Sequence, residues 1–325
     1  MHNSTRWLSR ARKEFEHVYN RHRVEESSYT LGEAEKKELL QEIGNSKYTL
    51  DASSFLQACT RKHRFMSGSI TIDVFSNRIG KKLHLQVART LYRMNAIVRM
   101  FLGNAPNDFV ITLIPLDEPR KKPTGNDVVE PYHINGGYTY VRHKNIYIYR
   151  LEEWPKVALH ELLHNMPMLQ EIKWTPVIIR KLYAMFNIDT KGCPKRCSTD
   201  LEPTEGIIEA WAIFLHTAFM SFETEGDFYR LFTNEIKWND HLIGWILKKQ
   251  DAQPDKKWRE GTHAFSYLVL RGILLHNMEA FLGMPMPYNP EALFQFFEKG
   301  WKGLVLRPSS TGNRNSMRMS RYGDV

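Results

Sequence analysis

The chain has 325 residues, of which 42% are hydrophobic and 25% are charged, an ordinary composition for a globular protein that buries a sizeable core. No run approaches the roughly 20 consecutive apolar residues needed to cross a bilayer, and the N-terminal residues lack the apolar core of a signal peptide. Membrane insertion and secretion are therefore not expected. The net charge of +9 is spread along the chain without a helix-turn-helix, zinc-finger or RNA-recognition signature, so nucleic-acid binding through the basic surface is not expected to be the main function.

The three cysteines also favour an intracellular protein. Cys59, Cys193 and Cys197 do not suggest a disulfide framework, and a reducing compartment is the default for such a chain. Cys193 and Cys197 are spaced like half of a metal site, but the chain has no second pair of cysteines to complete it. Two free thiols in a loop are the preferred interpretation.

The first half of the chain is predicted to contain an extension followed by a strand-rich lobe. Residues 1–66 are polar with a helical pattern, clearest over 34–43, and are expected to form an N-terminal extension. Residues 67–166 are expected to form an upper lobe, because alternating and β-branched runs indicate strands and one run has apolar residues at helical spacing. The predicted strands are 69–75, 109–116, 135–141 and 145–149, and the predicted crossover helix is 83–102.

The most informative motif follows the last of these strands. His160-Glu161-Leu162-Leu163-His164 has the pattern H-E-x-x-H within an otherwise apolar run. Positions i and i+4 lie on one face of an α-helix, so both imidazoles can reach one metal ion. Glu161 can then take a proton from a water molecule beside the metal. The motif predicts a site for one zinc ion per chain, and a core helix with two hydrogen-bonded histidines is the alternative.

A zinc site needs a third protein ligand, and two glutamates one helical turn apart are candidates. Glu205 and Glu209 lie on one face of a predicted helix over 203–222 that is otherwise apolar. A carboxylate on such a face is costly unless it meets a cation or is protonated. For Glu205 there is a second explanation, because an acid in the first turn of a helix is stabilised by the helix dipole. His216 shares the face with Glu209 two turns further on and is interpreted as a core histidine rather than as part of the site.

The segments after the motif are predicted to form a helical lower lobe over residues 167–303, followed by a disordered tail over 304–325 that is rich in Ser, Arg and Asn. On one face of its late helix, His263, Tyr267 and Arg271 form a polar stripe that can line a cleft or face solvent. The predicted helices of this lobe are 175–186, 203–222, 228–249, 262–282 and 290–301.

Strands before the motif helix and helices after it match the plan of the zincin metallopeptidases. The chain is therefore predicted to be an α+β protein with a zincin-like fold, in which a small mixed β-sheet forms the upper lobe and the motif helix floors a cleft above a mostly helical C-terminal lobe. In such a fold the edge strand of the sheet pairs with an extended substrate. Asn135, Gly136, Gly137 and Tyr138 stand where this strand is expected and are predicted to bind substrate, since glycines let another backbone approach closely. A Gly-Gly hairpin turn without a substrate role is the alternative.

Several segments resemble a known group of proteins. They are similar to uncharacterised zincin-like proteins encoded by large nucleocytoplasmic DNA viruses, and the likeness covers roughly residues 70–300. The segments that carry the resemblance are 134–139, 148–154, 156–164 and 262–271.

The resemblance is of the gluzincin type, and it implies roles for further residues. The segment from Glu209 to Ala212 resembles the third-ligand segment of gluzincins, so Glu209 is the predicted zinc ligand, with Glu205 as the alternative. Gluzincins commonly use a Tyr or His of the lower lobe to stabilise the oxyanion of the reaction. This implies such a role for Tyr267, with His263 as the next candidate.

The predicted function is that of a zinc metallopeptidase that hydrolyses a peptide or protein substrate with a metal-activated water. The viral resemblance implies a location inside the host cell, in the cytoplasm or packaged in the virion. A zinc-binding structural or virion protein on a catalytically silent zincin scaffold is the alternative. The presence of Glu161 argues against it, because a purely structural site has no use for a carboxylate at that position.

Overall fold

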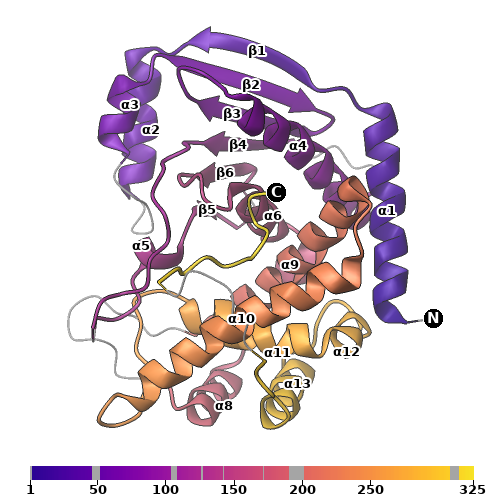
Figure 1. Cartoon of the computed structure of the whole chain (residues 1–325), viewed down its shortest axis with the longest axis vertical. Coiled ribbons are helices and arrows are strands. Elements are labelled where there is room, and N and C mark those ends of the chain that lie inside the picture. The colour runs from indigo at the N-terminus through magenta and orange to yellow at the C-terminus, as the bar shows by residue number, and fades with distance from the viewer. Residues whose placement is uncertain are drawn as a thin grey trace.

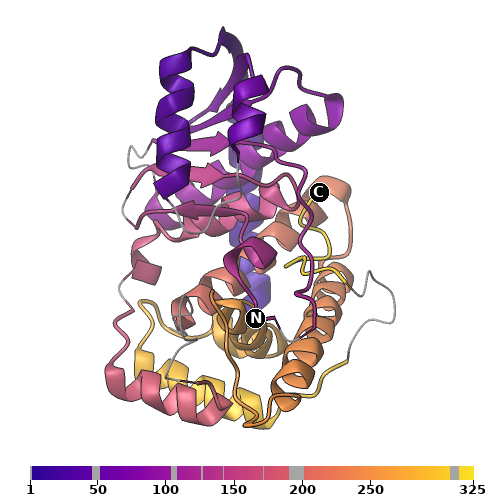
Figure 2. The ribbon, with the colours of Figure 1, turned by 90° about the vertical axis from the view of Figure 1, so that its left-hand side faces the viewer.

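The strands and the helices packed on them form the upper part of the molecule, and the helices that follow form the lower part (Figures 1 and 2). The computed structural model describes residues 2–45, 52–103, 108–125, 127–141, 143–170, 172–189, 201–307 and 315–325. The strands are β1 (Glu25–Thr30), β2 (Arg61–Ser67), β3 (Ile70–Phe75), β4 (Phe109–Leu113), β5 (Gly137–Thr139) and β6 (Asn145–Ile148). The helices before the lower part are α1 (Asn3–Arg21), α2 (Glu33–Asn45), α3 (Ser53–Ala58), α4 (Lys81–Leu102), α5 (Pro131–Ile134) and α6 (Trp154–Leu163). Those that follow are α7 (Pro167–Gln170), α8 (Pro176–Phe186), α9 (Pro203–Thr224), α10 (Phe228–Asp251), a π-helical turn η1 (Ser266–Leu270), α11 (Arg271–His276), α12 (Met278–Leu282) and α13 (Pro290–Lys302).

The sheet is mixed and ends at β5, the strand nearest the predicted cleft. Its order is β1-β2-β3-β4-β6-β5, with β3, β4 and β6 parallel and the other neighbours antiparallel. The register aligns Ile72 with Ile111 and Ile111 with Ile146, and all three side chains are fully buried. Because side chains alternate between the two faces of a strand, this aligned row forms one continuous apolar layer.

Helix α9 is the centre of the molecule. Every residue from Gly206 to Ser221 is buried, and the helix contacts α6, η1, α1, α10 and α11. Helix α6 follows β6 and packs on both the sheet and α9. The helix that carries the H-E-x-x-H motif is therefore held between the two parts of the chain.

The prediction of an α+β protein with a mixed sheet is confirmed, and two elements differ in detail. The strand predicted over 135–141 is shorter, because β5 spans Gly137–Thr139 and α5 ends just before it. The helix predicted over 262–282 is divided into η1, α11 and α12, with a break at Asn277, whose φ of −117° and ψ of 32° are not helical.

The N-terminal residues differ from the expected extension. Helix α1 packs against α4, α9 and α12, and β1 and β2 are strands of the main sheet. The buried side chains of α1 recur at helical spacing, namely Trp7, Ala11, Phe15 and Val18. Trp7 packs edge-on against Trp211 of α9 and donates a hydrogen bond to the Leu282 carbonyl at 3.2 Å.

The C-terminal segment, residues 315–325, corrects the expectation of a disordered tail. It passes between the sheet and α10 (Figure 1), and Met317 and Ser320 are fully buried. It has no regular secondary structure, but carboxylates and carbonyls of distant elements accept hydrogen bonds from its backbone amides. These bonds satisfy the backbone groups that irregular chain otherwise exposes to water.

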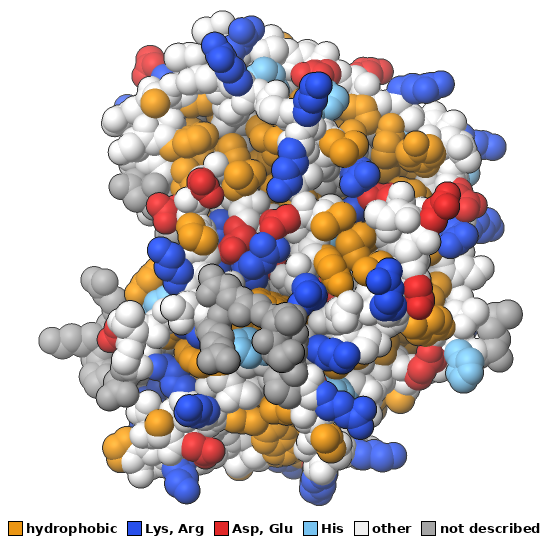
Figure 3. Space-filling model, in the orientation of Figure 1, with side chains coloured by type: hydrophobic (Ala, Val, Ile, Leu, Met, Phe, Trp, Pro, Cys, Tyr) orange, Lys and Arg blue, Asp and Glu red, His pale blue; other side chains and the backbone are white. Residues whose placement is uncertain are grey.

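No helix in the described part of the chain is both long enough and apolar enough to cross a membrane. On the face shown in Figure 3, Lys and Arg side chains are scattered among acidic and apolar ones.

Replacement of Trp7 tests whether α1 belongs to the core. Trp7→Ala should lower the free energy of unfolding by about 3–5 kcal/mol, because it removes a buried aromatic side chain. Tyr19→Ala is the control on the same helix, since Tyr19 is 61% exposed, and it should cost less than about 1 kcal/mol. Urea denaturation of the three proteins measures both effects. Equal and small losses of unfolding free energy in the two variants would show that α1 does not belong to the core.

Candidate metal centre

The two motif histidines lie one turn apart on a helix that is buried along its whole length. Helix α6 begins at Trp154 with Pro155 in its first turn, where the missing N–H of proline is not needed. Every residue from Trp154 to Leu163 is buried, so the side chains of His160 and His164 can only point along the polar stripe between α6 and α9.

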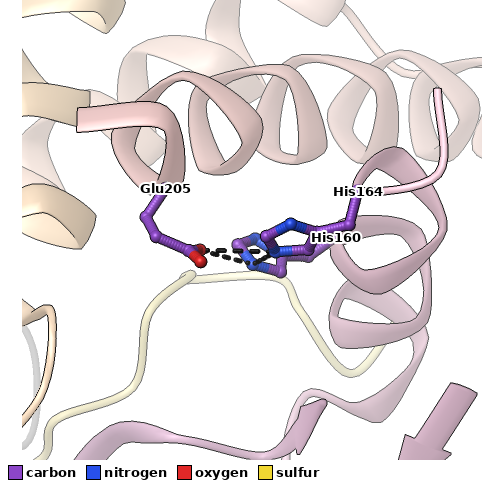
Figure 4. A group of neighbouring side chains, drawn as sticks. All are labelled: His160, His164 and Glu205. Atoms are coloured by element: carbon purple, nitrogen blue, oxygen red, sulfur yellow. Dashed lines mark hydrogen bonds and ion pairs between the residues drawn. The ribbon is translucent and has the colours of Figure 1, made fainter. Parts of the chain in front are cut away.

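Three ligand atoms converge on this stripe. His160 Nε2 lies 3.2 Å from His164 Nε2 and 3.3 Å from Glu205 Oε2, and His164 Nε2 lies 3.4 Å from the same oxygen (Figure 4). Two ligands of a tetrahedral zinc ion with bonds of about 2.0–2.1 Å are separated by about 3.3–3.4 Å. The triangle therefore has the dimensions of one face of a zinc coordination tetrahedron, and these three residues can hold a metal ion.

The chemistry of the donors also fits a cation. Two imidazole nitrogens and one carboxylate oxygen are a common zinc ligand set. Glu205 Oε2 is inaccessible to solvent and accepts no hydrogen bond of normal geometry from the described residues. A buried carboxylate oxygen in this state is costly unless a cation meets it.

The structure reverses the predicted order of the two glutamates. Glu205, the alternative, points at the two histidines, whereas Glu209 lies one turn further along α9, on the other side of the His160 ring. Glu209 Oε2 is 2.7 Å from His160 Nδ1, the nitrogen that faces away from the triangle. The geometry therefore favours Glu205 over Glu209 as the third candidate ligand and places Glu209 where it orients the His160 ring.

Glu209 is itself fixed by two buried cations. Its Oε1 accepts a hydrogen bond from Lys156 Nζ at 2.5 Å and from Arg271 Nη1 at 2.9 Å, and all three side chains are at most 3% exposed. Because Glu209 is ionised, it accepts the proton of His160 Nδ1 and leaves Nε2 to face the triangle. Carboxylates that hold a ligating histidine in this way fix its tautomer and ring orientation.

The charges of the site stabilise one another. Burial alone would lower the pKa of His160, but the adjacent carboxylates of Glu205 and Glu209 raise it to about 10. Burial would raise the pKa of Glu205, but His164 and His160 hold it well below its usual value. Without metal, the His160 imidazole therefore carries positive charge beside the two carboxylates.

Glu161 lies at the base of a cavity of about 350 Å³. The cavity is also bordered by His164 and Glu205 from the metal centre, by β5, and by the apolar side chains of Leu169, Ile172 and Ile208. Burial raises the pKa of the Glu161 carboxyl, and the nearby His160 and His164 oppose this effect. The carboxyl is thus adjacent to the triangle and to a space that another molecule can enter.

Tyr267 and His263 also border this cavity. Tyr267 lies in the π-helical turn η1, a deviation from α-helix that often occurs at functional sites. Burial, with the nearby carboxylates of Glu205 and Glu161, raises the pKa of Tyr267 well above its usual value, so its hydroxyl stays protonated and can donate a hydrogen bond. Arg271 does not continue this stripe into the cavity, because it is fully buried and points at Glu209.

A glycine allows the helix of Glu205 to approach the helix of Tyr267. A Cβ atom on Gly206 would lie 2.8 Å from the Ser266 carbonyl oxygen and 2.9 Å from Leu270 Cβ. Both contacts are shorter than normal van der Waals distances, so a larger residue would push α9 and η1 apart. Gly206 therefore sets the distance between the third candidate ligand and the tyrosine.

The predicted substrate-binding residues lie beside the cavity, but the glycines among them have a different explanation. Asn135, Gly137 and Tyr138 line the cavity, and Gly136 lines a small recess behind it. A Cβ atom on Gly136 would collide with the buried Arg120 guanidinium, and one on Gly137 would lie 2.8 Å from the Tyr147 carbonyl oxygen. Glycine is therefore needed at both positions because neighbouring groups of the chain leave no room for a Cβ atom, and not because a substrate backbone must approach.

Other sequence candidates lie away from the site. His216 is fully buried and contacts Arg93 and the Tyr322 carbonyl, and burial together with Arg93 lowers its pKa to about 3, so it is a neutral core histidine. Cys193 and Cys197 lie outside the described residues, and Cys59 is a buried free thiol. Sequence reasoning missed Lys156, although a lysine within an apolar helix is a signal that a buried carboxylate lies nearby.

The structure thus brings together His160, His164 and Glu205, with Glu161 and Tyr267 beside them. No family model, curated protein or solved structure matches the chain.

Replacement of the two glutamates tests the ligand assignment. Glu205→Ala should lower zinc affinity by more than about 100-fold, because it removes a direct ligand, whereas loss of an orienting residue such as Glu209 typically costs about 10–100-fold. Competition with a chromogenic chelator measures both affinities, and circular dichroism checks that each variant is folded. The opposite order would restore Glu209 as the ligand.

Glu260 supports the helix that carries Tyr267 and gives a pH-dependent prediction. Its carboxyl is 3% exposed and accepts the backbone N–H of Phe265 at 3.0 Å. Burial raises its pKa to about 8, and this hydrogen bond only partly opposes the effect. Between the unperturbed pKa of 4.5 and about 8, the folded chain binds more protons than the unfolded chain. The contribution of Glu260 to the free energy of unfolding therefore falls as pH rises through this range.

Glu260→Gln should remove this loss, because glutamine stays neutral and keeps an oxygen for the Phe265 N–H. The stability of the variant relative to wild type should be higher at pH 8.5 than at pH 5 by more than about 1 kcal/mol, since one pKa unit corresponds to about 1.4 kcal/mol. Urea denaturation of both proteins at the two pH values gives the difference. A difference that does not change with pH would mean that Glu260 is ionised in the folded chain.

Proposed function

We propose that the chain is a zinc-dependent peptidase with a zincin-like fold. The observation that carries the proposal is the triangle of His160 Nε2, His164 Nε2 and Glu205 Oε2, with edges of 3.2–3.4 Å, beside a cavity that Glu161 borders. His160, His164 and Glu205 would hold the ion. A zinc ion bound there would lower the pKa of water to about 7 and polarise a carbonyl group.

Glu161 is the general base of the proposed reaction. Its carboxylate takes a proton from the attacking water and delivers it to the amine that leaves when the peptide bond breaks. A base works best when its pKa lies near the working pH, and burial shifts the pKa of Glu161 in that direction.

Tyr267 is the proposed donor to the oxyanion. Its raised pKa keeps the hydroxyl protonated, and its ring centroid lies 5.8 Å from that of His160. A donor held in advance at the position where negative charge develops lowers the barrier without reorganisation. His263, one helical turn earlier on the cavity wall, is the second candidate for this role.

An extended peptide is the proposed substrate. β5 is the last strand of the sheet, and Gly137, Tyr138 and Thr139 of this strand border the cavity. A peptide backbone can add to such an edge as a further strand and lie across the base and the metal ligands. The resemblance of residues 70–300 to zincin-like proteins of large DNA viruses supports the same assignment, and a location in the host cytoplasm or the virion stays a prediction.

Glu161→Gln tests the proposed enzyme. Glutamine keeps the size of the side chain but cannot accept the proton, so hydrolysis should fall by about 10²–10⁴-fold. Zinc should stay at one equivalent per chain in the wild type and the variant, because Glu161 is not a ligand. Elemental analysis gives the metal content, and digestion of a mixture of unfolded proteins with mass-spectrometric readout gives the activity.

Two outcomes would contradict the proposal. Wild-type protein with full zinc that cuts nothing would exclude the peptidase, and unchanged cutting by Glu161→Gln would place the chemistry elsewhere. His164→Ala is the matched control, because it should lose metal and activity together.

A further inference from the structure

We propose that the C-terminal segment, residues 315–325, is a positioning element of the metal centre. The segment fixes Arg271, Arg271 fixes Glu209, and Glu209 orients His160. This inference rests on the proposed zinc site, and it adds to that site a part of the chain that contributes no ligand to it.

The segment is held by two buried carboxylates that accept its backbone amides. Glu153 accepts from Met319 N at 2.9 Å and from Ser320 N at 2.6 Å. Glu235 accepts from Arg321 N at 2.9 Å and from Tyr322 N at 3.0 Å. Both carboxylates are at most 2% exposed, so the amides of the segment take the place of water as hydrogen-bond donors to them.

The first link to the metal centre runs through the Met319 carbonyl. Arg271 Nη1 donates to this oxygen at 2.7 Å and to Glu209 Oε1 at 2.9 Å, and Arg271 Nε donates to Asn239 at 2.9 Å. The guanidinium is planar, so these three acceptors together fix its position. Glu209 Oε2 then meets His160 Nδ1 at 2.7 Å. If the Met319 carbonyl is lost, one of the three acceptors that hold Arg271 against Glu209 is lost with it.

The second link runs through the start of α6. Glu153 immediately precedes this helix, with a φ of 61° that leads the chain into it, and its own N–H donates to Asp324 Oδ1 at 2.5 Å. Gly323 packs directly on the Glu153 side chain, since a Cβ atom there would lie 2.9 Å from it. The segment therefore surrounds the residue from which the helix of His160 and His164 begins.

The closing experiment measures zinc affinity by chelator competition and the visible absorption spectrum of the cobalt(II)-substituted protein, so it needs no substrate. A chain that ends at residue 314 should bind zinc about 10–100-fold more weakly than the full chain, the usual effect of losing an orienting contact. Its cobalt spectrum should also change, because His160 is no longer held in one orientation. A synthetic peptide of residues 315–325 should restore both.

A full-length variant covers the case in which the shortened chain does not fold. In Glu153→Gln one of the two acceptor oxygens becomes an amide NH2, which cannot accept a backbone N–H, so the segment should loosen and zinc affinity should again fall by about 10-fold or more. Tyr322→Phe is the matched control, because it removes a hydrogen bond between the segment and Asn234 that lies on neither link. Its affinity and cobalt spectrum should equal those of the wild type.

Wild-type affinity in folded Glu153→Gln, or in the folded shortened chain, would overturn the inference. An equal loss of affinity in Tyr322→Phe would overturn the two links through Arg271 and Glu153, since the effect would then not depend on the contacts that form them. Wild-type protein that binds zinc and cuts nothing would instead remove the proposed peptidase and leave this inference standing.

Discussion

One buried carboxylate, that of Glu209, determines how the centre of the molecule is arranged. It meets His160 and Lys156 of α6 and Arg271 of α11, and none of these partners is exposed enough to be solvated by water. Transfer of such charges into the interior costs several kcal/mol per ion, and loss of one partner would leave another uncompensated. Helices α6, α9 and α11 therefore have one relative position in which every charge is satisfied. In that position His160 Nε2 faces Glu205 and His164.

This dependence explains why the sequence could predict the histidines but not the correct glutamate. The spacing of His160 and His164 is a local property of one helix, and it is sufficient to place both imidazoles on one face. Glu205 and Glu209 share a face for the same reason, so periodicity cannot distinguish them. Their roles depend on where α6 crosses α9 and on Lys156 and Arg271, which lie 53 and 62 residues from Glu209 in the sequence. Only the tertiary packing brings these charges together.

The fold shows the same difference between local patterns, which can be predicted from the sequence, and long-range contacts, which cannot. Strands β3 and β4 and helices α4 and α9 follow apolar patterns that are complete within each segment, so they could be predicted. Helix α1 has a polar composition because only one narrow stripe of it is buried. The C-terminal segment has no periodic pattern at all, and it is ordered by Glu153 and Glu235, which belong to other elements. When the acceptors of a segment's backbone hydrogen bonds lie elsewhere in the chain, the composition of the segment alone suggests disorder.

The shape of the site favours a catalytic role over a silent scaffold. Structural zinc sites are closed by four protein ligands, whereas catalytic sites use three and leave one position open. Within the described ranges, the group that could hold a metal ion at this site comprises His160, His164 and Glu205, and His164 and Glu205 border the cavity. Glu161 borders that cavity, although burial disfavours its charged form and a structural site would gain nothing from it. A buried acid that opens on a cavity beside three candidate metal ligands is costly for stability, and the proposed proton transfer would account for that cost.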